Sequence, residues 1–213
     1  MTNKKISVLL VDDHAVVRKG VELMLADADD ISIDGEAENA QQALELVRER
    51  NFDVALVDIA MPDKNGLDLL KQLRTEKPKL AVLILSTYSE EIYAVRAVKL
   101  GAAGYLTKDT PEATLIGAVR KAAAGGKYFS PALVEKLAGM FGNASAASHD
   151  TLSNRELEVM KLIAAGESLV KIAETLHLSP HTVTTYRARI LEKMGMKSNA
   201  ELTRYAIENG LLM

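Results

Sequence analysis

Four short polar segments of this sequence could do chemistry together, because each directly follows a mostly apolar run of strand length. They are Asp12-Asp13, Asp58, Ser86-Thr87 and Thr107-Lys108. If the four runs are parallel strands of one sheet, their carboxyl ends meet at one edge, where open α/β sheets bind ligands. Three carboxylates, one or two hydroxyls and one ammonium would then share a pocket.

The chemistry of such a pocket is suited to Mg²⁺ and a phosphoryl group. Three carboxylates at close range repel each other, and a hard divalent cation removes that repulsion. Mg²⁺ binds oxygen ligands, typically one or two carboxylates with waters and a phosphate. Asp58 follows the central strand, which makes it the natural nucleophile. Lys108 would offset charge on the transferring oxygens, and Ser86 would hydrogen-bond one of them.

Each of these residues also has a simpler structural explanation. Asp13 and Ser86 are both typical helix N-caps. Asp58 could belong to an ordinary turn, and Lys108 could be a solvated surface lysine. The shared pocket is favoured because the predicted sheet independently brings all four residues to one edge.

The elements that position these residues follow from hydrophobic periodicity in residues 1–125. Stretches with helical spacing of apolar residues separate five strand candidates. The solid apolar character of most of these strands indicates burial on both faces. Strands that alternate with helices predict an α/β domain, a doubly wound five-stranded parallel sheet of flavodoxin-like form. The predicted strands are 6–11, 31–37, 53–58, 80–85 and 104–107.

The sequence changes in character after residue 125. A short helical piece leads into GNASAASHD at 142–150, which is small, polar and unpatterned as linkers are. Only helical periodicity follows, which predicts a small all-α domain of four helices. The predicted organisation is an α/β domain at 1–125, a linker at 126–150 and a helical domain at 151–213. The four helices are expected near 154–165, 168–176, 180–194 and 199–209.

Composition excludes several classes of protein. Hydrophobic residues make up 48% and charged residues 26% of the 213 residues, as in ordinary soluble globular proteins. The chain has no cysteine, so disulfides, zinc–thiolate sites and a cysteine nucleophile are excluded. No apolar stretch reaches the ~20 residues that span a bilayer, and the first apolar run is too short for a signal peptide. We therefore expect a cytoplasmic protein with no membrane partner.

Residues 166–195 have the pattern of a helix-turn-helix. Ser168 and Ser179 are placed to cap two successive helices, and Pro180 occupies the first position of the second. That second helix turns an apolar face inward and a polar face without acids outward, as a helix that enters the major groove does. The inward residues are Val183, Tyr186, Ile190 and Met194, and the outward ones Thr182, Thr184, Thr185, Arg187, Ala188 and Arg189.

Residues 5–125 resemble the receiver domain of two-component response regulators. The motifs are VDDH (11–14), VDIAMPDKNG (57–66), LILST (83–87) and GYLTKD (104–109). The resemblance implies that a partner sensor histidine kinase phosphorylates Asp58. It also implies that Mg²⁺ is held by Asp13, Asp58 and the main-chain carbonyl of Ala60, with Asp12 acting through water.

Further roles are implied by the same resemblance. Lys108 would contact the phosphoryl group, while Ser86 and Tyr105 match the hydroxyl and aromatic switch positions of the family. Thr87 is the less favoured alternative to Ser86. Such a domain is not an enzyme for other molecules, although it would assist its own phosphorylation and dephosphorylation.

Residues 151–213 resemble the LuxR-type DNA-binding domain of the NarL/FixJ group. The resemblance implies binding to double-stranded promoter half-sites and a homodimer when the protein is phosphorylated or DNA-bound, with the last helix as the dimer surface. The domain has a net charge of only +1, so few phosphate contacts are expected per copy. Two departures from the group, Leu169-Val170 for an Asn-Lys pair and Thr184 for a lysine, bear on base preference. The expected DNA-contacting residues are Lys171, Thr182, Thr184, Thr185, Arg187, Ala188, Arg189 and Lys193.

Four other functions compete with a phosphorylation-controlled transcription factor. A flavin phosphate would be repelled by the acids after the first strand, and small-molecule phosphatases carry Asp-x-Asp where this chain has Asp58-Ile59-Ala60. Two alternatives stay open from sequence alone: an adaptor that is never phosphorylated, and a helical domain that binds protein instead of DNA.

Overall fold

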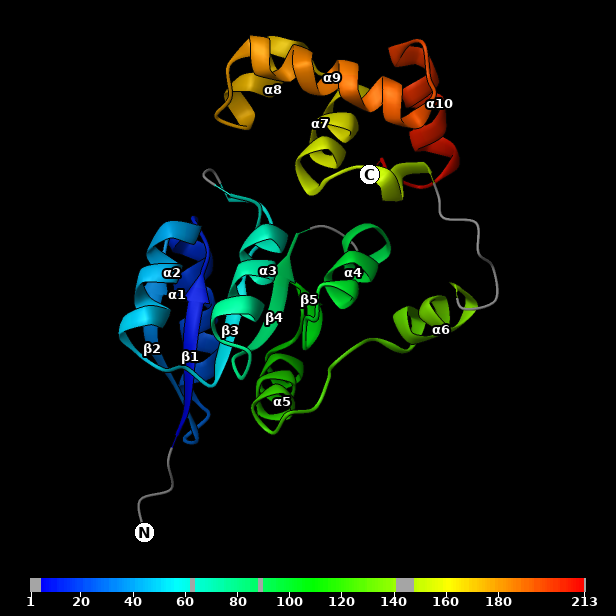
Figure 1. The fold of residues 1–213 in the computed structure, drawn as a ribbon. Coiled ribbons are helices and arrows are strands. Elements are labelled where there is room, and N and C mark those ends of the chain that lie inside the picture. Colours follow the sequence, from blue (N-terminus) through cyan, green and yellow to red (C-terminus); the bar gives the residue numbers. More distant parts are fainter. Residues whose placement is uncertain (1–4, 62–63, 88–89, 141–147, 213) are drawn as a thin grey trace. The chain divides into compact units, whose positions relative to one another are not determined.

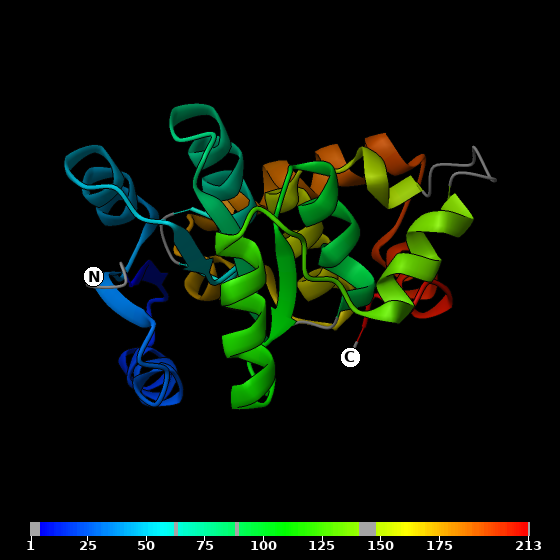
Figure 2. The same cartoon turned by 90° about the horizontal axis from the view of Figure 1, so that it is seen from below.

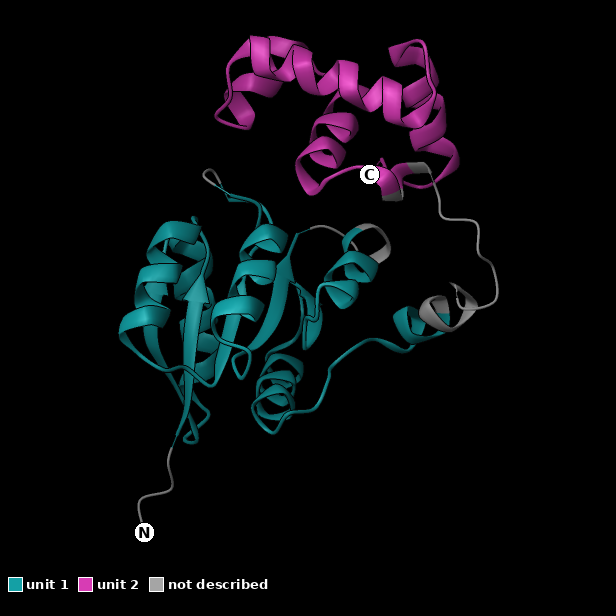
Figure 3. Ribbon diagram, in the orientation of Figure 1, with its two compact units in different colours: residues 1–142 teal, residues 143–213 magenta. Residues whose placement is uncertain are grey.

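The computed structural model describes residues 5–61, 64–87, 90–140 and 148–212. The chain divides into two compact units, residues 1–142 and 143–213 (Figure 3). Two parts of the predicted connections lie outside the described residues. They are 62–63 in the turn after the third predicted strand and 141–147 in the predicted linker.

A five-stranded parallel sheet forms the centre of the first unit (Figure 1). Its order is β2-β1-β3-β4-β5, so the chain winds in one direction from β1 to β2 and in the other from β3 to β5. This confirms the doubly wound sheet, and it makes the β1–β3 boundary the point where ligands bind in such folds. The strands are β1 (Ile6–Val11), β2 (Ile31–Ala37), β3 (Val54–Val57), β4 (Ala81–Ser86) and β5 (Gly104–Thr107).

Two strands differ slightly from their predicted bounds. β3 lacks the predicted end residues Asp53 and Asp58, although the backbone N–H groups of both still donate to β1, at 2.8 Å to Ser7 and 2.9 Å to Val11. β4 begins and ends one residue later than predicted. Ser86 therefore belongs to the sheet, where it pairs with Thr107 of β5.

Helices cover both faces of this sheet (Figures 1 and 2). α1 and α5 pack together on one face, and α2, α3 and α4 contact one another in sequence on the other. The core beneath α1 and α5 joins strand residues such as Leu10 and Leu56 to Leu25 and Val119. The helices are α1 (Ala15–Ala26), α2 (Ala40–Glu49), α3 (Gly66–Glu76), α4 (Glu90–Lys99) and α5 (Glu112–Ala123), and α6 (Pro131–Met140) contacts α4.

The second unit is the predicted set of four short helices, preceded by a 3₁₀ turn, η1 (Ser148–Thr151). A serine caps each helix by accepting a hydrogen bond from the N–H three residues on. Gly195 ends the longest helix in the left-handed conformation, with φ of +65°. The helices are α7 (Asn154–Ala164), α8 (Leu169–Thr175), α9 (Pro180–Met194) and α10 (Asn199–Glu208), and the capping serines are Ser153, Ser168, Ser179 and Ser198.

α7 is the centre of this helical unit, because it contacts α8, α9 and α10. Its core consists of fully buried aliphatic side chains from all four helices. Tyr186 of α9, which was predicted to face inward, is only half-buried. The core side chains include Leu157, Ile172, Val183, Ile190 and Leu202.

Gly66 provides a test of the packing that leads into the site. A Cβ built on Gly66 would lie 1.9 Å from the main-chain oxygen of Asp58, so any side chain there must push the two segments apart. We expect Gly66→Ala to lower the free energy of unfolding by about 2 kcal/mol or more. In the control Gly20→Ala, a Cβ meets nothing within 4 Å in the exposed part of α1, so stability should rise by up to about 1 kcal/mol. Equal changes in urea denaturation of the two variants would contradict this account.

Candidate functional site

Acidic residues meet where β1 and β3 end side by side. Asp12 follows β1 and Asp58 follows β3, and both are almost completely buried, at 1% and 2% exposure. Carboxylate oxygens of Asp12, Asp13 and Asp58 and a ring nitrogen of His14 all lie within 4.8 Å of one another. The structure therefore brings together the three carboxylates that the sequence assigned to one pocket.

Lys108 connects the two buried carboxylates. Its Nζ lies 2.6 Å from Oδ2 of Asp12 and 2.9 Å from Oδ2 of Asp58. The backbone N–H of Lys108 donates to the carbonyl of Ser86, which holds the lysine at the joint end of β4 and β5. Burial opposes its charge, but the hydrogen bonds and charges of the two aspartates outweigh that effect and raise the pKa of Lys108. It is thus not a solvated surface lysine.

Among the residues of the pocket, Asp58 has the most strongly shifted pKa. Burial raises the pKa of Asp58, the charge and hydrogen bond of Lys108 lower it in part, and the charge of Asp12 raises it again, with a net pKa of about 6. Its Oδ1 is buried and has no hydrogen-bond partner among the residues that the structure describes. A buried oxygen of this kind is a ready acceptor for an arriving ligand.

The residues present fit a divalent cation. Three carboxylates and the Lys108 ammonium leave a net charge of about −2, which one Mg²⁺ would neutralise. The donors are oxygens, as Mg²⁺ prefers, and Oδ1 of Asp58 lacks another partner among the described residues. The acidic cluster could therefore hold a metal ion. Ala60, whose carbonyl was predicted to contribute, lies half-buried in the same loop, two residues after Asp58.

The remaining predicted pocket residues lie on β4 and β5. Ser86 is fully buried at the end of β4, whereas Thr87 just beyond it is exposed. Tyr105 is also fully buried, in β5, where it pairs with Ile84 of β4. Ser86 belongs to β4, and Asp13 does not cap α1, because the cap residue of α1 is His14 and no side-chain hydrogen bond is made there.

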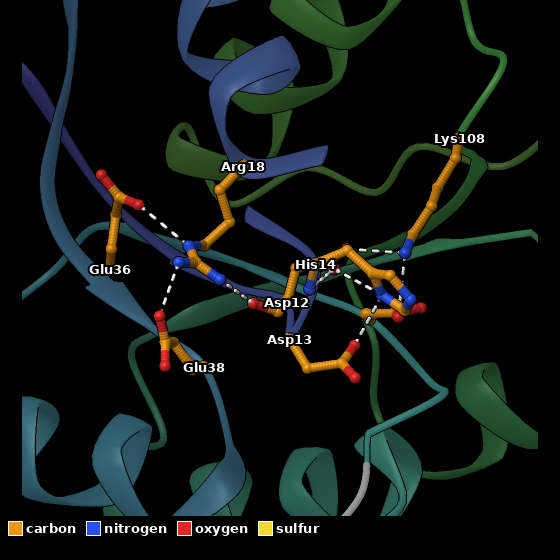
Figure 4. A network of polar contacts seen from close by, with 8 residues as sticks. Asp12, Asp13, His14, Arg18, Glu36, Glu38 and Lys108 are labelled. Carbon is orange, nitrogen blue, oxygen red and sulfur yellow. Dashed lines mark hydrogen bonds and ion pairs between the residues drawn. The ribbon is translucent and has the colours of Figure 1, made fainter. Parts of the chain in front are cut away.

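Sequence reasoning missed three residues around this pocket. His14 places Nδ1 2.7 Å from Oδ1 of Asp13, and Gly66 packs directly on the Asp58 backbone. Arg18 is buried, and its guanidinium lies beside Asp12 and donates to the Asp12 carbonyl (Figure 4). The available signal for Arg18 was its place on the inner stripe of α1, at helical spacing from Val21 and Leu25, where a charged residue needs partners.

Half of the outward face of α9 is exposed, at Thr184, Ala188 and Arg189, and several of its polar groups are already engaged. The hydroxyls of Thr184 and Thr185 donate to the carbonyls four residues earlier, at 2.9 and 3.1 Å. Arg187 donates through Nε to Oδ1 of Asn199 at 2.6 Å. Arg189 is exposed, and its side chain has no hydrogen bond or ion pair within the described part of the chain.

Of the other predicted DNA-contacting residues, two make hydrogen bonds within the helical unit and two are exposed. Thr182 shares a hydrogen bond of 2.8 Å with the hydroxyl of Ser179, its helix cap. Lys193 donates to Oε2 of the buried Glu156 at 2.6 Å. Ala188 on α9 and Lys171 on α8 are exposed.

Comparison with known protein families decides what kind of chain this is. The family described as "Response regulator receiver domain" matches residues 8–120, more than half of the chain. The chain belongs to the response regulators. A second family, "Bacterial regulatory proteins, luxR family", matches residues 150–206. This response regulator is therefore of the NarL/FixJ type, a two-component transcription regulator with a phosphoryl-accepting receiver and a LuxR-type DNA-binding domain.

Relatives of similar length support this assignment. Response regulator GacA of Pseudomonas viridiflava is 36% identical over 209 residues, which cover 97% of this chain and 98% of GacA. Response regulator UvrY of Escherichia coli is 33% identical over 208 residues, covering 97% and 95% of the two chains. A structure of RcsB from Salmonella enterica serovar Typhimurium has a TM-score of 0.64 at 23% identity, covers 95% of this chain and 98% of that one, and shares the fold.

One further property concerns membranes. Within the described residues, no helix of this response regulator is both long enough and apolar enough to span a bilayer.

The buried charge of Asp58 gives a testable pH dependence in metal-free protein. Between its ordinary pKa of 3.8 and the folded value of about 6, the folded state binds more protons at Asp58 than the unfolded chain does. Stability therefore falls as pH rises through this range, and above it the ionised carboxylate costs roughly 3 kcal/mol. We expect Asp58→Asn to be more stable than wild type at neutral pH in the presence of EDTA, with the difference vanishing at acid pH.

Urea denaturation at a series of pH values measures this difference. Asp29→Asn, at an exposed position, is the control and should show no such trend. A stability difference between Asp58→Asn and wild type that stays the same at every pH would show that desolvation of Asp58 is not its cause.

Proposed function

We propose that this response regulator accepts a phosphoryl group on Asp58 from a sensor histidine kinase, and that phosphorylation controls binding of its LuxR-type domain to promoter DNA. The observation that carries the proposal is the ionisable, buried Asp58 beside Asp12 and Lys108 at the β1–β3 boundary. The folded pKa of about 6 leaves this carboxylate largely ionised at neutral pH, as a nucleophile must be.

In the proposed reaction, a carboxylate oxygen of Asp58 bonds to phosphorus as the bond from phosphorus to the donor nitrogen breaks. Asp13, Asp58 and the Ala60 carbonyl would hold Mg²⁺, with Asp12 acting through water. The metal would supply positive charge to the transferring oxygens. Lys108 already touches Asp58, so its ammonium needs only a small movement to reach an oxygen of the new phosphoryl group.

The proposed link from the pocket to the rest of the molecule runs through Ser86 and Tyr105. Ser86 lies at the end of β4, next to the Lys108 backbone, and would hydrogen-bond the phosphoryl group. Movement of the loop after β4 would then alter the space available to Tyr105, which is fully buried in this structure. Such a local change biases a two-state element.

The cations proposed to contact DNA differ in whether they already have a partner within the second unit. Arg189 is the freest cation of the α9 face and is assigned to a phosphate. Arg187 and Lys193 would have to leave Asn199 and Glu156 to reach one. The remaining proposed contacts are Lys171, Thr182, Thr184, Thr185 and Ala188.

The proposed binding to DNA has consequences for the oligomeric state and the cellular location of the protein. A weakly basic domain gains affinity when two copies bind linked half-sites, so we propose a homodimer on DNA. DNA binding would place the protein in the cytoplasm. We retain the predicted division into a receiver at 1–125, a linker at 126–150 and a DNA-binding domain at 151–213.

Phosphorylation by a small donor tests the receiver. With acetyl phosphate and Mg²⁺, wild type should gain one acid-labile phosphate, detected by intact-protein mass spectrometry. Asp58→Asn keeps the shape of the side chain but removes the anionic nucleophile, so it should gain none. Asp68→Asn, exposed in the first turn of α3, should react like wild type. EDTA should abolish the reaction, and labelling of Asp58→Asn at the wild-type rate would refute the assignment.

Binding-site selection tests the DNA-binding domain. Arg189→Ala should weaken binding to all sequences alike and reduce the salt slope by about one per contact per subunit. Thr184→Lys should change the selected sequence more than the overall affinity, because position 184 faces the bases. Lys79→Ala, at an exposed position of the receiver between α3 and β4, is the control for loss of one charge. The division between these roles is wrong if Arg189→Ala alters the selected motif and Thr184→Lys does not.

A further inference from the structure

We propose that Arg18 is a positioning residue of the acidic pocket. It fixes the peptide that joins Asp12 to Asp13, and so sets the direction of both carboxylates. This inference rests on the proposed function of the pocket, to which it adds a residue that does not itself touch metal or phosphate.

The contacts of Arg18 engage its guanidinium in three directions (Figure 4). Nη1 donates to the main-chain carbonyl of Asp12 at 2.7 Å, and this contact is buried. Nε donates to Oε2 of Glu36 at 3.0 Å, and Nη2 donates to Oε1 of Glu38 at 2.8 Å. The Arg18 side chain is 11% exposed, whereas the two glutamates are much more open to solvent. We call these three contacts of Arg18 the clamp. It connects the buried carbonyl of Asp12 to the more exposed carboxylates of Glu36 and Glu38.

The carbonyl of Asp12 matters because a peptide unit is planar. Its oxygen lies in one plane with the N–H and Cα of Asp13, so holding that oxygen also orients the Asp13 backbone. The N–H of Asp12 donates to Ala37 at 3.1 Å, and its Oδ1 accepts from the N–H of His14 at 2.8 Å. With Arg18 on the carbonyl, Asp12 is held at its N–H, its carbonyl and its carboxylate.

The two glutamates belong to segments that must stay close to the end of β1. Glu36 is part of β2 and pairs with Leu10 of β1. Glu38 comes directly before Asn39, the cap of α2, and its backbone N–H donates to Oε1 of Gln42 at 2.9 Å. This hydrogen bond holds the Glu38 backbone at the start of α2. Arg18 therefore joins α1 to the ends of β1 and β2 and to the start of α2.

A guanidinium suits this task better than an ammonium. Its nitrogens lie in one rigid plane and donate in fixed, divergent directions, whereas a lysine offers one compact charge. Arg18→Lys therefore keeps the charge but cannot keep all three contacts. A variant that removed the positive charge of Arg18 would by itself favour Mg²⁺ binding. Because Arg18→Lys keeps that charge, a change in its Mg²⁺ affinity reports the lost contacts and not the charge.

Calorimetric titration of Mg²⁺ into the full chain tests the proposal without any phosphorylation. Arg18→Lys should bind Mg²⁺ about ten-fold more weakly than wild type, as is typical when a residue that orients metal ligands is lost. The matched control is Arg48→Lys, which alters a pair of hydrogen bonds between Arg48 and Glu76 on the exposed surface of α2 and α3. Its Mg²⁺ affinity should equal that of wild type.

A second readout separates positioning from general damage. Excess Mg²⁺ should restore phosphorylation of Arg18→Lys by acetyl phosphate, because the nucleophile Asp58 is untouched. Circular dichroism shows whether the variant is folded. If it is not, Glu38→Ala, which removes the acceptor of Arg18 Nη2, is measured in about 0.5 M KCl. At this salt the effect of a distant exposed charge is screened, and the variant should still weaken Mg²⁺ binding.

The outcomes are distinguishable. Mg²⁺ affinity equal to wild type in folded Arg18→Lys, or in Glu38→Ala at high salt if Arg18→Lys does not fold, overturns the role of Arg18 and leaves the pocket intact. If wild type itself binds no Mg²⁺, the proposed function of the pocket fails, and this inference fails with it.

Discussion

The concentration of negative charge at the end of β1 and β3 is the constraint on which the receiver depends. Two nearly inaccessible carboxylates, Asp12 and Asp58, are tolerable only because Lys108 lies between them. That arrangement requires β1, β3 and β5 to end at the same edge, and the parallel sheet order β1-β3-β4-β5 achieves this. The solid apolar strands therefore do more than form a core, because they bring three chain segments to one edge.

The two units are stabilised in different ways. The receiver buries mostly apolar strands between two layers of helices, and this core supports the acidic residues at the edge of the sheet. The DNA-binding unit has short helices around α7, each begun by a serine cap, and its longest helix is ended by Gly195. Its polar pairs connect helices to one another: Lys193 joins α9 to Glu156 of α7, and Arg187 joins α9 to the start of α10.

Much of this architecture could be predicted from the sequence, because periodicity and capping are local signals. The strands, the helix-turn-helix and the meeting of Asp12, Asp13, Asp58 and Lys108 all follow from runs of residues and from sheet topology. The clamp of Arg18 on Glu36 and Glu38 could not be predicted in the same way. Periodicity shows that a residue faces inward, but it does not identify the partner on another element. The close approach of Gly66 to Asp58 is likewise a distance between two backbones that only the folded chain reveals.

The hydroxyl groups on α9 have a consequence for how this helix could read DNA. Thr184 and Thr185 direct their hydroxyl protons at carbonyls of their own helix, so they present lone pairs and methyl groups outward. In the major groove, guanine offers only acceptors, whereas adenine and cytosine offer an amino donor and thymine a methyl group. If α9 enters the groove as proposed, these side chains could accept from an adenine or cytosine amino group or pack on a thymine methyl, but they could not donate to guanine. The chain would then recognise a site partly by excluding one base instead of selecting one.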